Sequence, residues 1–285
     1  MRRFLNGIVP AAIIAAAATA MIGCGSSTGS VTTAAQTKQP SPSSAVSSAI
    51  PSPGATPAAL AVWPSAAALA TTERWLRGRI GVTSFAVVDS RGRLHGYRYD
   101  SQFGSASVVK AMLLVQYLRT RAGISRRERL LLTRMIVDSD NAATDRVFAR
   151  VGMDGLNDLA RVAGMRRFTP SSVWALSQVT AADQARFFFR LDGLVPQLHR
   201  ALLRQVLGQH GPYRGWGIPQ AALLHGWHVY WKDGWMHSAR GELLLQAARL
   251  ERPGITFAVA VIADGQPTTG YGVATMRGVG ERLLR

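Results

Sequence analysis

Short hydrophobic runs lie near both ends of the folded part of the chain, and they predict β-strands. The first run is rich in β-branched residues and stops at Ser90-Arg91-Gly92-Arg93, a turn signal, so the first two predicted strands form a hairpin. The five predicted strands are 82–89, 94–99, 228–232, 242–250 and 255–263. The chain therefore contributes strands from both of its halves.

Between these strands, apolar residues recur every three or four positions, which predicts helices. Thr180 and Asp183 form a variant of the capping box at the start of one of them. The predicted helices are 66–79, 108–118, 130–136, 142–150, 182–191 and 273–284. Strands at both ends with helices between them predict an α+β fold. We expect an antiparallel sheet formed by both ends of the chain with flanking helices, and an inserted all-helical lobe at about 107–222.

The first residues are typical of an export signal. Arg2 and Arg3 precede an apolar run at 4–21, and Cys24 follows a small residue after it. This end resembles the lipobox of bacterial lipoproteins, which implies cleavage after residue 23 and a membrane anchor on Cys24. The exported protein would then face the cell-wall or periplasmic side of the membrane. The alternative is an ordinary signal peptide or an N-terminal membrane anchor. Because Cys24 is the only cysteine, no intramolecular disulfide can form.

Residues 24–63 are predicted to be a flexible tether. They consist mainly of Ser, Thr, Ala, Pro and Gly, and Lys38 is their only charged residue. Such a segment cannot bury enough apolar surface to offset its ordering entropy. The folded domain is therefore expected at 64–285, which is long enough for one substantial core.

The net charge of +17 arises from 33 Lys and Arg residues against 16 Asp and Glu residues. The arginines are scattered, without a block of five or six, so we expect a solvated basic surface and no nucleic-acid partner. Only Lys38, Lys110 and Lys232 are lysines. Arginine cannot give up its proton to serve as a base, so the positions that kept lysine are candidates for chemistry.

The first motif that carries chemistry is Ser107-Val108-Val109-Lys110, at the start of a predicted helix. A spacing of three residues places the hydroxyl and the amine on one helix face, within hydrogen-bond reach. A serine needs a base to act as a nucleophile, and a buried lysine can be that base because burial lowers its pKa. The alternative is a helix serine followed by an exposed lysine.

Two further motifs have both a functional and a structural interpretation. Ser139-Asp140-Asn141 lies between two predicted helices, where all three residue types are suited to a helix N-cap. Lys232-Asp233-Gly234 lies at the end of the predicted strand 228–232. A lysine beside a strand glycine places a cation where a ligand can approach closely. The alternative there is an edge-strand lysine followed by a turn.

Together and in this order, the three motifs resemble those of the serine β-lactamase and penicillin-binding superfamily, S-x-x-K, S-D-N and K-[ST]-G. The resemblance is strongest to class A β-lactamases and related actinobacterial serine hydrolases, and it covers about residues 64–285. Residues 271–279, at the start of the C-terminal helix, and 215–219, before the strand with the third motif, are also similar to this family. The resemblance implies a β-lactamase/transpeptidase-like fold.

The resemblance also implies acyl transfer. Ser107 would attack a carbonyl carbon and form an acyl-enzyme, and Lys110 would accept the hydroxyl proton, directly or through water. Ser139 would pass a proton to the leaving nitrogen, while Asn141 would position the substrate amide and Lys110. No metal ion or other cofactor is implied. The implied substrates are β-lactams or peptidoglycan-type peptides, and the protein is expected to be a monomer.

The third motif is implied to bind the substrate. Lys232 would hold Lys110 neutral by like-charge repulsion and attract a substrate carboxylate, with Gly234 beside it. The oxyanion would lie between the backbone N–H groups of Ser107 and Trp235.

The sequence departs from the family pattern at two points. Class A enzymes carry a glutamate on a loop after the S-D-N motif that activates water for deacylation, whereas the corresponding residues 166–179 contain no carboxylate. Asp183 is the next acidic residue, and we expect it to cap a helix. Asp233 stands where the family has Thr or Ser. A carboxylate cannot donate a hydrogen bond to a substrate carboxylate, so it would either pair with Lys232 or turn away from the cleft.

These observations predict a class A β-lactamase-like serine hydrolase that acylates Ser107 and deacylates slowly. Two alternatives stay open at this point. One is a penicillin-binding D,D-peptidase, for which slow deacylation of β-lactams is normal. The other is a non-catalytic cell-envelope binding lipoprotein that keeps the cleft as a scaffold.

Overall fold

The computed structural model describes residues 62–209 and 215–284. The predicted signal peptide at 1–23, the candidate lipidation site Cys24 and nearly all of the predicted tether at 24–63 lie outside the described residues. Within the described part, Trp63 packs edge-on against Trp227, with the ring centroids 5.5 Å apart. In the two described ranges, no helix is long and apolar enough to cross a membrane.

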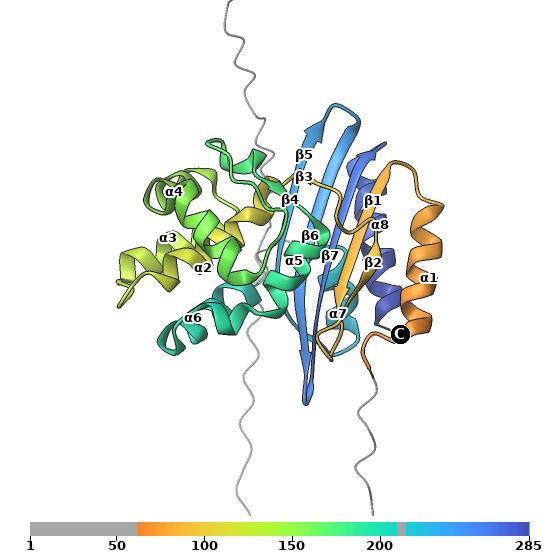
Figure 1. Cartoon of the computed structure of the whole chain (residues 1–285), viewed down its shortest axis with the longest axis horizontal. Coiled ribbons are helices and arrows are strands. Elements are labelled where there is room, and N and C mark those ends of the chain that lie inside the picture. Colours follow the sequence, from red (N-terminus) through yellow and green to blue (C-terminus); the bar gives the residue numbers. More distant parts are fainter. Residues whose placement is uncertain (1–61, 210–214, 285) are drawn as a thin grey trace, which may run out of the picture. The chain divides into compact units, whose positions relative to one another are not determined.

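A five-stranded antiparallel sheet forms the centre of the fold, in the order β2-β1-β7-β6-β5 (Figure 1). Its strands are β1 (Val82–Val88), β2 (Leu94–Tyr97), β5 (His228–Ser238), β6 (Gly241–Arg252) and β7 (Ile255–Gln266). Strand β1 pairs with β7 from Val82↔Asp264 to Val88↔Ala258, so the two ends of the domain share one sheet. This arrangement confirms the predicted α+β fold.

Strand β5 differs from its prediction because it is eleven residues long. Its pairing with β6 continues to Ser238↔Gly241, so Lys232-Asp233-Gly234 lies inside the strand and not at its end. The strand is at the edge of the sheet, where polar side chains are tolerated on the open side. The polar run after Trp231 therefore did not mark a strand end, so the predicted end at residue 232 was wrong, as was the alternative of a turn after Lys232.

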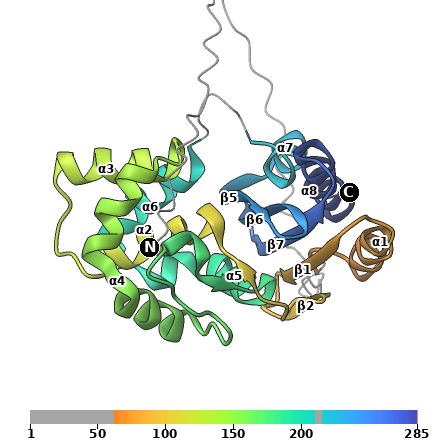
Figure 2. The same ribbon diagram turned by 90° about the horizontal axis from the view of Figure 1, so that it is seen from above.

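Helices cover both faces of the sheet (Figure 2). Helices α1 (Ala66–Arg77), α7 (Ile218–Leu224) and α8 (Thr269–Leu283) lie on one face, and α5 (Ala181–Phe189) lies on the other. Successive strand residues alternate between the two cores: Val259 packs with the α8 side, and Ala258 and Ala260 pack with the α5 side. This period of two is expected for a sheet that is buried on both faces.

Beyond α5 lies the helical lobe, which contains α2 (Val109–Arg119), α3 (Arg126–Val137), α4 (Asn141–Ala163) and α6 (Gln197–Gly208). Helix α4 is longer than predicted because it continues through a kink at Gly152, where φ is +66°. Every residue of α2 from Val109 to Leu118 is buried. The central helix of the lobe is thus shielded on all sides, although it carries a lysine.

Short elements complete the lobe and its junction with the sheet. Three are 3₁₀ turns and two are strands that pair with each other: η1 (Ala106–Val108), η2 (Trp174–Leu176), η3 (Leu191–Leu194), β3 (Phe103–Gly104) and β4 (Gln178–Val179). The inserted segment is therefore helical apart from β4, which ties it to the residues just before η1.

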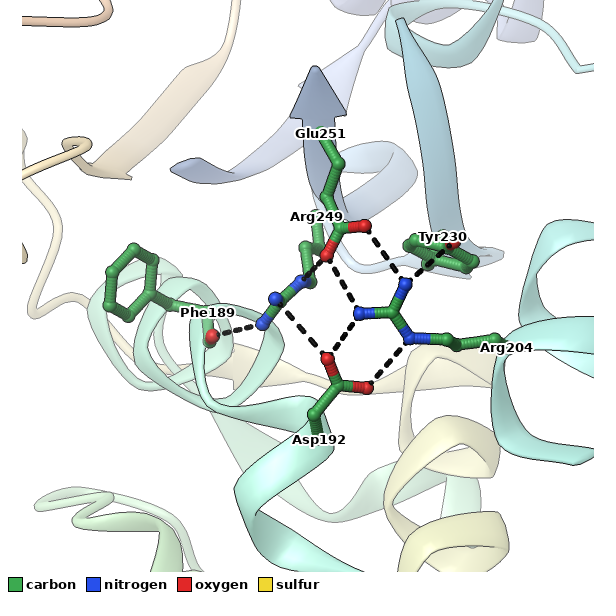
Figure 3. A network of polar contacts seen from close by, with 6 residues as sticks. All are labelled: Phe189, Asp192, Arg204, Tyr230, Arg249 and Glu251. Carbon is green, nitrogen blue, oxygen red and sulfur yellow. Dashed lines mark hydrogen bonds and ion pairs between the residues drawn. The ribbon is translucent and has the colours of Figure 1, made fainter. Parts of the chain in front are cut away.

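An ionic network joins the lobe to the sheet (Figure 3). The guanidinium of Arg204 on α6 bonds both carboxylate oxygens of Asp192 on η3 and also Glu251 on β6. Arg249 contacts the same two carboxylates, at 3.3 Å and 2.6 Å. Burial raises the pKa of Asp192, but its hydrogen bond with Arg204 and the charge of Arg249 outweigh this and lower the pKa overall. The network fixes α6 against the strands that carry the candidate site.

Candidate active site

The candidate nucleophile Ser107 lies in the 3₁₀ turn η1, directly before α2 and not within that helix. The preceding residue, Ala106, has a φ of +44°, a left-handed conformation that is rare for residues with a side chain. Strand β5 approaches this turn closely at Gly234, where a Cβ atom would lie 2.7 Å from Ser107 N and 3.0 Å from Val108 N. Only glycine fits at this point without displacing the nucleophile.

Lys110 is in the first turn of α2 and is completely buried. Its Nζ donates hydrogen bonds to Ser139 O at 2.6 Å, Ser139 Oγ at 3.2 Å and Asn141 Oδ1 at 2.7 Å. The ring centroid of Trp174 lies 4.9 Å from Nζ. All of these groups are uncharged, so the ammonium is solvated by neutral oxygens and an indole.

The expected hydrogen bond between Ser107 and Lys110 is not formed. Within the described residues, Lys110 Nζ bonds only to Ser139 and Asn141. The prediction assumed that both residues lie in one helix, whereas Ser107 lies in η1 and Lys110 in α2, with its amine bonded to Ser139 and Asn141. Hydrogen bonds between catalytic groups are often completed only in the complex with substrate, so this geometry does not exclude a proton transfer.

The environment of Lys110 favours its neutral form. Burial and, after it, the positive charge of Lys232 lower the pKa of Lys110 from its usual value of 10.5 to about 8. The predicted repulsion between the two lysines is therefore present, but it is second to burial. An amine with this pKa is half neutral near pH 8 and can accept a proton.

The S-D-N motif shows that its two interpretations are compatible. Asp140 is the N-cap of α4: its side chain accepts from Ala143 N at 2.8 Å and pairs with Arg134. The bond from Ala143 N is the largest of the effects that lower the pKa of Asp140. Ser139 has a φ of +51°, and Asn141 begins the helix. This cap fixes the backbone at Asp140, so that the adjacent residues Ser139 and Asn141 are oriented toward Lys110.

In the third motif, Lys232 and Asp233 form an ion pair. Lys232 is 3 % exposed, and its Nζ lies 2.7 Å from Asp233 Oδ1. The other carboxylate oxygen, Oδ2, accepts a hydrogen bond of 2.9 Å from Trp216 Nε1. Of the two orientations that the sequence left open for Asp233, the structure has the pairing with Lys232. The ammonium that was expected to attract a substrate carboxylate is already paired.

Trp216 is held in place by Gln246 on β6, the register partner of Asp233. Gln246 Nε2 donates to Trp216 O at 2.7 Å, and its Oε1 accepts from Ile218 N at 3.0 Å. Gly217 has a φ of +69°, and a Cβ there would lie 2.4 Å from Gln246 Oε1. The indole that binds Asp233 is thus positioned by a buried side chain on the neighbouring strand.

A cavity of about 510 Å³ lies between the S-D-N motif and β5. Its lining combines aliphatic, uncharged polar, aromatic and charged side chains: Ile136, Val137, Asp138, Ser139, Gln209, Trp216, Trp231, Lys232, Asp233 and Trp235. Trp235 directly follows Gly234 and is 60 % exposed. The structure therefore brings Ser139, Lys232 and Trp235 to one cavity, beside the Lys110 cluster that contains Asn141.

The loop at 166–179 shows what stands in place of the absent glutamate. Trp174 lies against Lys110, and its Nε1 donates to Asp145 Oδ1 on α4 at 2.8 Å. Asp183 accepts hydrogen bonds of 2.8 Å from the backbone N–H groups of Arg166 and Arg167. Its carboxylate anchors the start of the loop, while Thr180 caps α5. The expected helix-capping role of the Asp183 side chain was therefore wrong.

Sequence reasoning missed Trp174, Asp145 and Trp216 as parts of the site. Trp174 and Trp216 lie outside the periodic runs that define helices and strands, and no sequence pattern connects either of them with the three motifs. Across the described residues, no group of three or more His, Cys, Asp or Glu side chains is arranged to hold a metal ion.

A comparison with family models identifies the class of protein. Residues 121–285, more than half of the chain, match the model described as a beta-lactamase enzyme family. The chain belongs to this family, and its fold is that of the class A β-lactamase-like serine hydrolases. The matched part contains Ser139, Asn141 and Lys232 and begins after Ser107 and Lys110. A comparison with curated proteins gives no match.

Solved structures share the fold at low sequence identity. A class A β-lactamase from Bacteroides cellulosilyticus is 14% identical, with a TM-score of 0.65 over 78% of this chain and 97% of that one. A class A β-lactamase from Mycobacterium abscessus is 19% identical, with a TM-score of 0.62 over 76% and 98%. A β-lactamase from Sphaerobacter thermophilus is 19% identical, with a TM-score of 0.60 over 75% and 94%. The chain thus spans almost the whole length of these proteins.

Proposed function

We propose that this protein is a cell-envelope serine hydrolase that forms an acyl-enzyme on Ser107 and releases it slowly. The observation that carries the proposal is the buried amine of Lys110, which bonds Ser139 and Asn141 and has a pKa of about 8. Burying a charged lysine without a carboxylate partner costs free energy, so burial favours the neutral form of Lys110. This neutral amine lies three residues after the partly exposed Ser107, where it can act as a base.

Acylation follows from this arrangement. The Oγ atom of Ser107 attacks the carbonyl carbon of an amide or β-lactam, and its proton passes to Lys110, directly or through water. Ser139, which is bonded to Lys110, delivers a proton to the leaving nitrogen. The developing oxyanion accepts hydrogen bonds from the backbone N–H groups of Ser107 and Trp235, which the close contact at Gly234 brings together. Asn141 orients Lys110.

Slow deacylation follows from the loop at 166–179. It contains no carboxylate that could activate a water, and the Trp174 indole covers Lys110 on the side of this loop. The hydrogen bond to Asp145 fixes the indole in this position. Hydrolysis of the acyl-enzyme then depends on a water that has no loop carboxylate to activate it and that the indole keeps away from Lys110. This property would suit a D,D-peptidase as well as an inefficient β-lactamase.

The proposed location follows from the N-terminal sequence. A lipid on Cys24 and the tether at 24–63 would hold the domain near the outer side of the membrane, where peptidoglycan-type peptides are available. Labelling of the intact chain with radioactive palmitate, compared with a Cys24→Ala variant, tests this part separately.

The central test measures adducts and turnover together. The full chain in detergent is incubated with a chromogenic cephalosporin and with benzylpenicillin, and intact mass and product release are recorded. We expect one adduct per chain, a lifetime of minutes or longer, and no adduct in the Ser107→Ala variant. Fast turnover that depends on Ser107 would contradict slow deacylation. No adduct with either compound or with D-Ala-D-Ala peptides would instead favour the non-catalytic binding lipoprotein.

A further inference from the structure

The cavity beside the nucleophile has an unusual charge for this protein. The described residues that line it include one ammonium, that of Lys232, and two carboxylates, those of Asp138 and Asp233. None of these lining residues is an arginine, although the chain as a whole has a net charge of +17. The described part of the lining therefore carries one more negative than positive side chain.

The ammonium of Lys232, the one cation among the described lining residues, is already paired. Lys232 is almost completely buried and lies 2.7 Å from Asp233 Oδ1. Trp216 Nε1 holds the other carboxylate oxygen at 2.9 Å, so Asp233 cannot turn away from the ammonium without losing both contacts. A carboxylate that entered would have to compete with Asp233 for the ammonium and would lie next to that acid. Like charges at such distances repel strongly when they are partly desolvated.

The rest of the cavity suits a cation. Trp216, Trp231 and Trp235 line it, and the face of an indole attracts ammonium groups. Trp216 is fixed by Asp233 and Gln246, so at least one of these rings is held rigidly in the cavity wall. Aromatic rings together with carboxylates form the usual surroundings of alkylammonium ligands.

The position of the cavity shows which part of the substrate it receives. Ser139 bonds Lys110 and also lines the cavity. If Ser139 delivers the proton to the leaving atom, as the proposed function requires, then the leaving group lies in this cavity. We propose that the cavity selects acyl donors whose leaving group carries a positive charge, in place of a carboxylate. This inference rests on the proposed function for the reaction, but binding of the charged group can be measured without it.

The first experiment uses three thioesters of N-benzoyl-D-alanine that differ in the leaving thiol. Thiocholine is cationic, mercaptoacetamide is neutral and mercaptoacetate is anionic. Ser107 Oγ forms a bond to the carbonyl carbon, the C–S bond breaks, the hydroxyl proton passes to Lys110 and the sulfur leaves as a thiol after protonation. Acylation of the full chain is followed by intact mass. Each rate is divided by the rate at which hydroxide hydrolyses the same thioester, because the thiols differ as leaving groups.

We expect the normalised rate to fall in the order thiocholine, mercaptoacetamide, mercaptoacetate, with at least a tenfold difference between the first and the last. The Asp233→Thr variant, which frees the ammonium of Lys232, should reduce this ratio at least tenfold. If the threonine variant does not fold, Asp233→Asn takes its place. It keeps the shape of the side chain and should also reduce the ratio of the two rates. The matched control is Asp154→Thr, an exposed acid outside the cavity, which should leave the ratio unchanged.

A second experiment measures binding alone in the Ser107→Ala variant. Tryptophan fluorescence is titrated with phenyltrimethylammonium and with benzoate, and we expect the cation to bind at least tenfold more tightly. An anionic thioester that reacts as fast as the neutral one, or tighter binding of benzoate, overturns the inference. If no thioester acylates Ser107 but the cation binds as expected, the proposed reaction fails while the selectivity of the cavity stands.

Discussion

Lys110 on α2 and Lys232 on β5 are both buried, but their surroundings differ. Lys110 donates to a carbonyl, a hydroxyl and an amide oxygen, all of which are neutral. Lys232 lies against the carboxylate of Asp233. Burial and the charge of Lys232 lower the pKa of Lys110 to about 8. One amine is therefore prepared to exchange a proton, and the charge of the other is compensated by a neighbour in the chain.

This difference separates two properties of the site, proton transfer at Lys110 and the choice of substrate charge at Lys232. In the proposed reaction, the S-x-x-K and S-D-N residues provide the base, and nothing in that arrangement depends on the substrate's charge. In the proposed selectivity, the third motif decides which charge the substrate can carry. A substitution at Asp233 can therefore change selectivity while the proton-transfer side stays intact.

The largest effect is expected from removing the amine that can lose its proton. Lys110→Met keeps the length and apolar stem of the side chain, and Lys110→Arg keeps its charge but cannot act as a base at neutral pH. Both should slow acylation of Ser107 by about 10³-fold, within the usual range for loss of a general base. Adduct formation is followed by intact mass, and thermal unfolding shows whether each variant folds.

The matched change at the second lysine is Lys232→Arg, which can still pair with Asp233. We expect acylation of Ser107 to slow by about tenfold only, since a positive charge remains near Lys110. If Lys110→Arg were acylated as fast as the unmodified protein, the assignment of Lys110 as the base would be wrong.

The next effect concerns the contact that joins the two sides. In Gly234→Ala, the new methyl group would lie 2.7 Å from Ser107 N and 3.0 Å from Ala106 Cβ, so the turn η1 must shift. We expect acylation to slow by about 10²-fold, because a displaced oxyanion donor typically costs this much. Overpacking should also lower the free energy of unfolding by about 1–3 kcal/mol. Gly123→Ala is the control, since no atom lies within 4 Å of its Cβ position. Equal effects at the two glycines would contradict the proposed contact.

Much of this arrangement could be predicted from sequence because it depends on local patterns. The short apolar runs of β1 and β7 and the three- and four-residue spacing in α2 and α5 placed the sheet and the lobe, and the S-D-N motif contains a true N-cap, Asp140. Strand β5 was predicted too short because polar residues on an edge strand do not interrupt its backbone pairing.

The contacts that define the site could not be predicted in this way because they join distant residues. The partners of Lys110 lie 29 and 31 residues away, and Trp216 lies 17 residues from Asp233. No periodic pattern connects these positions. The pairing of Asp233 with Lys232, and with it the charge of the cavity, therefore depended on the structure.

The pH dependence of acylation tests how far the two lysines are coupled. Because Lys110 must be neutral to accept a proton, the rate should rise with pH and reach half its maximum near pH 8. Lys232→Gln removes the repulsion that lowers the pKa of Lys110 and leaves Asp233, whose charge raises that pKa. The midpoint should move upward, and the rate at pH 7 should fall by about three- to tenfold. A midpoint that stays in place would show that burial alone sets this pKa.

The same shift predicts how stability depends on pH. The folded protein loses the Lys110 proton near pH 8, whereas the unfolded chain keeps it up to about 10.5. Between these values the unfolded state binds more protons, so this residue's contribution to the free energy of unfolding increases with pH. Urea unfolding at pH 7.5 and 9.5 measures this contribution in the unmodified protein and in Lys110→Met. The increase in the free energy of unfolding between the two pH values should be absent from the methionine variant.

The smallest effect is expected from replacing Trp174, beside Lys110, or Trp235, which lines the cavity with Lys232. Trp174 covers Lys110, and Trp174→Ala would admit water to an amine whose lowered pKa is caused mainly by burial. The midpoint of acylation should move upward, with a two- to fivefold slower reaction at about pH 7, and the acyl-enzyme should hydrolyse faster because water can reach it. Trp174→Phe keeps a ring over the amine and loses only the bond to Asp145, so its effect should be smaller. Trp235→Ala, on the side of Lys232, should leave the midpoint unchanged. If Trp174→Ala and Trp235→Ala changed the midpoint equally, the protection of Lys110 would not be specific to its own side of the site.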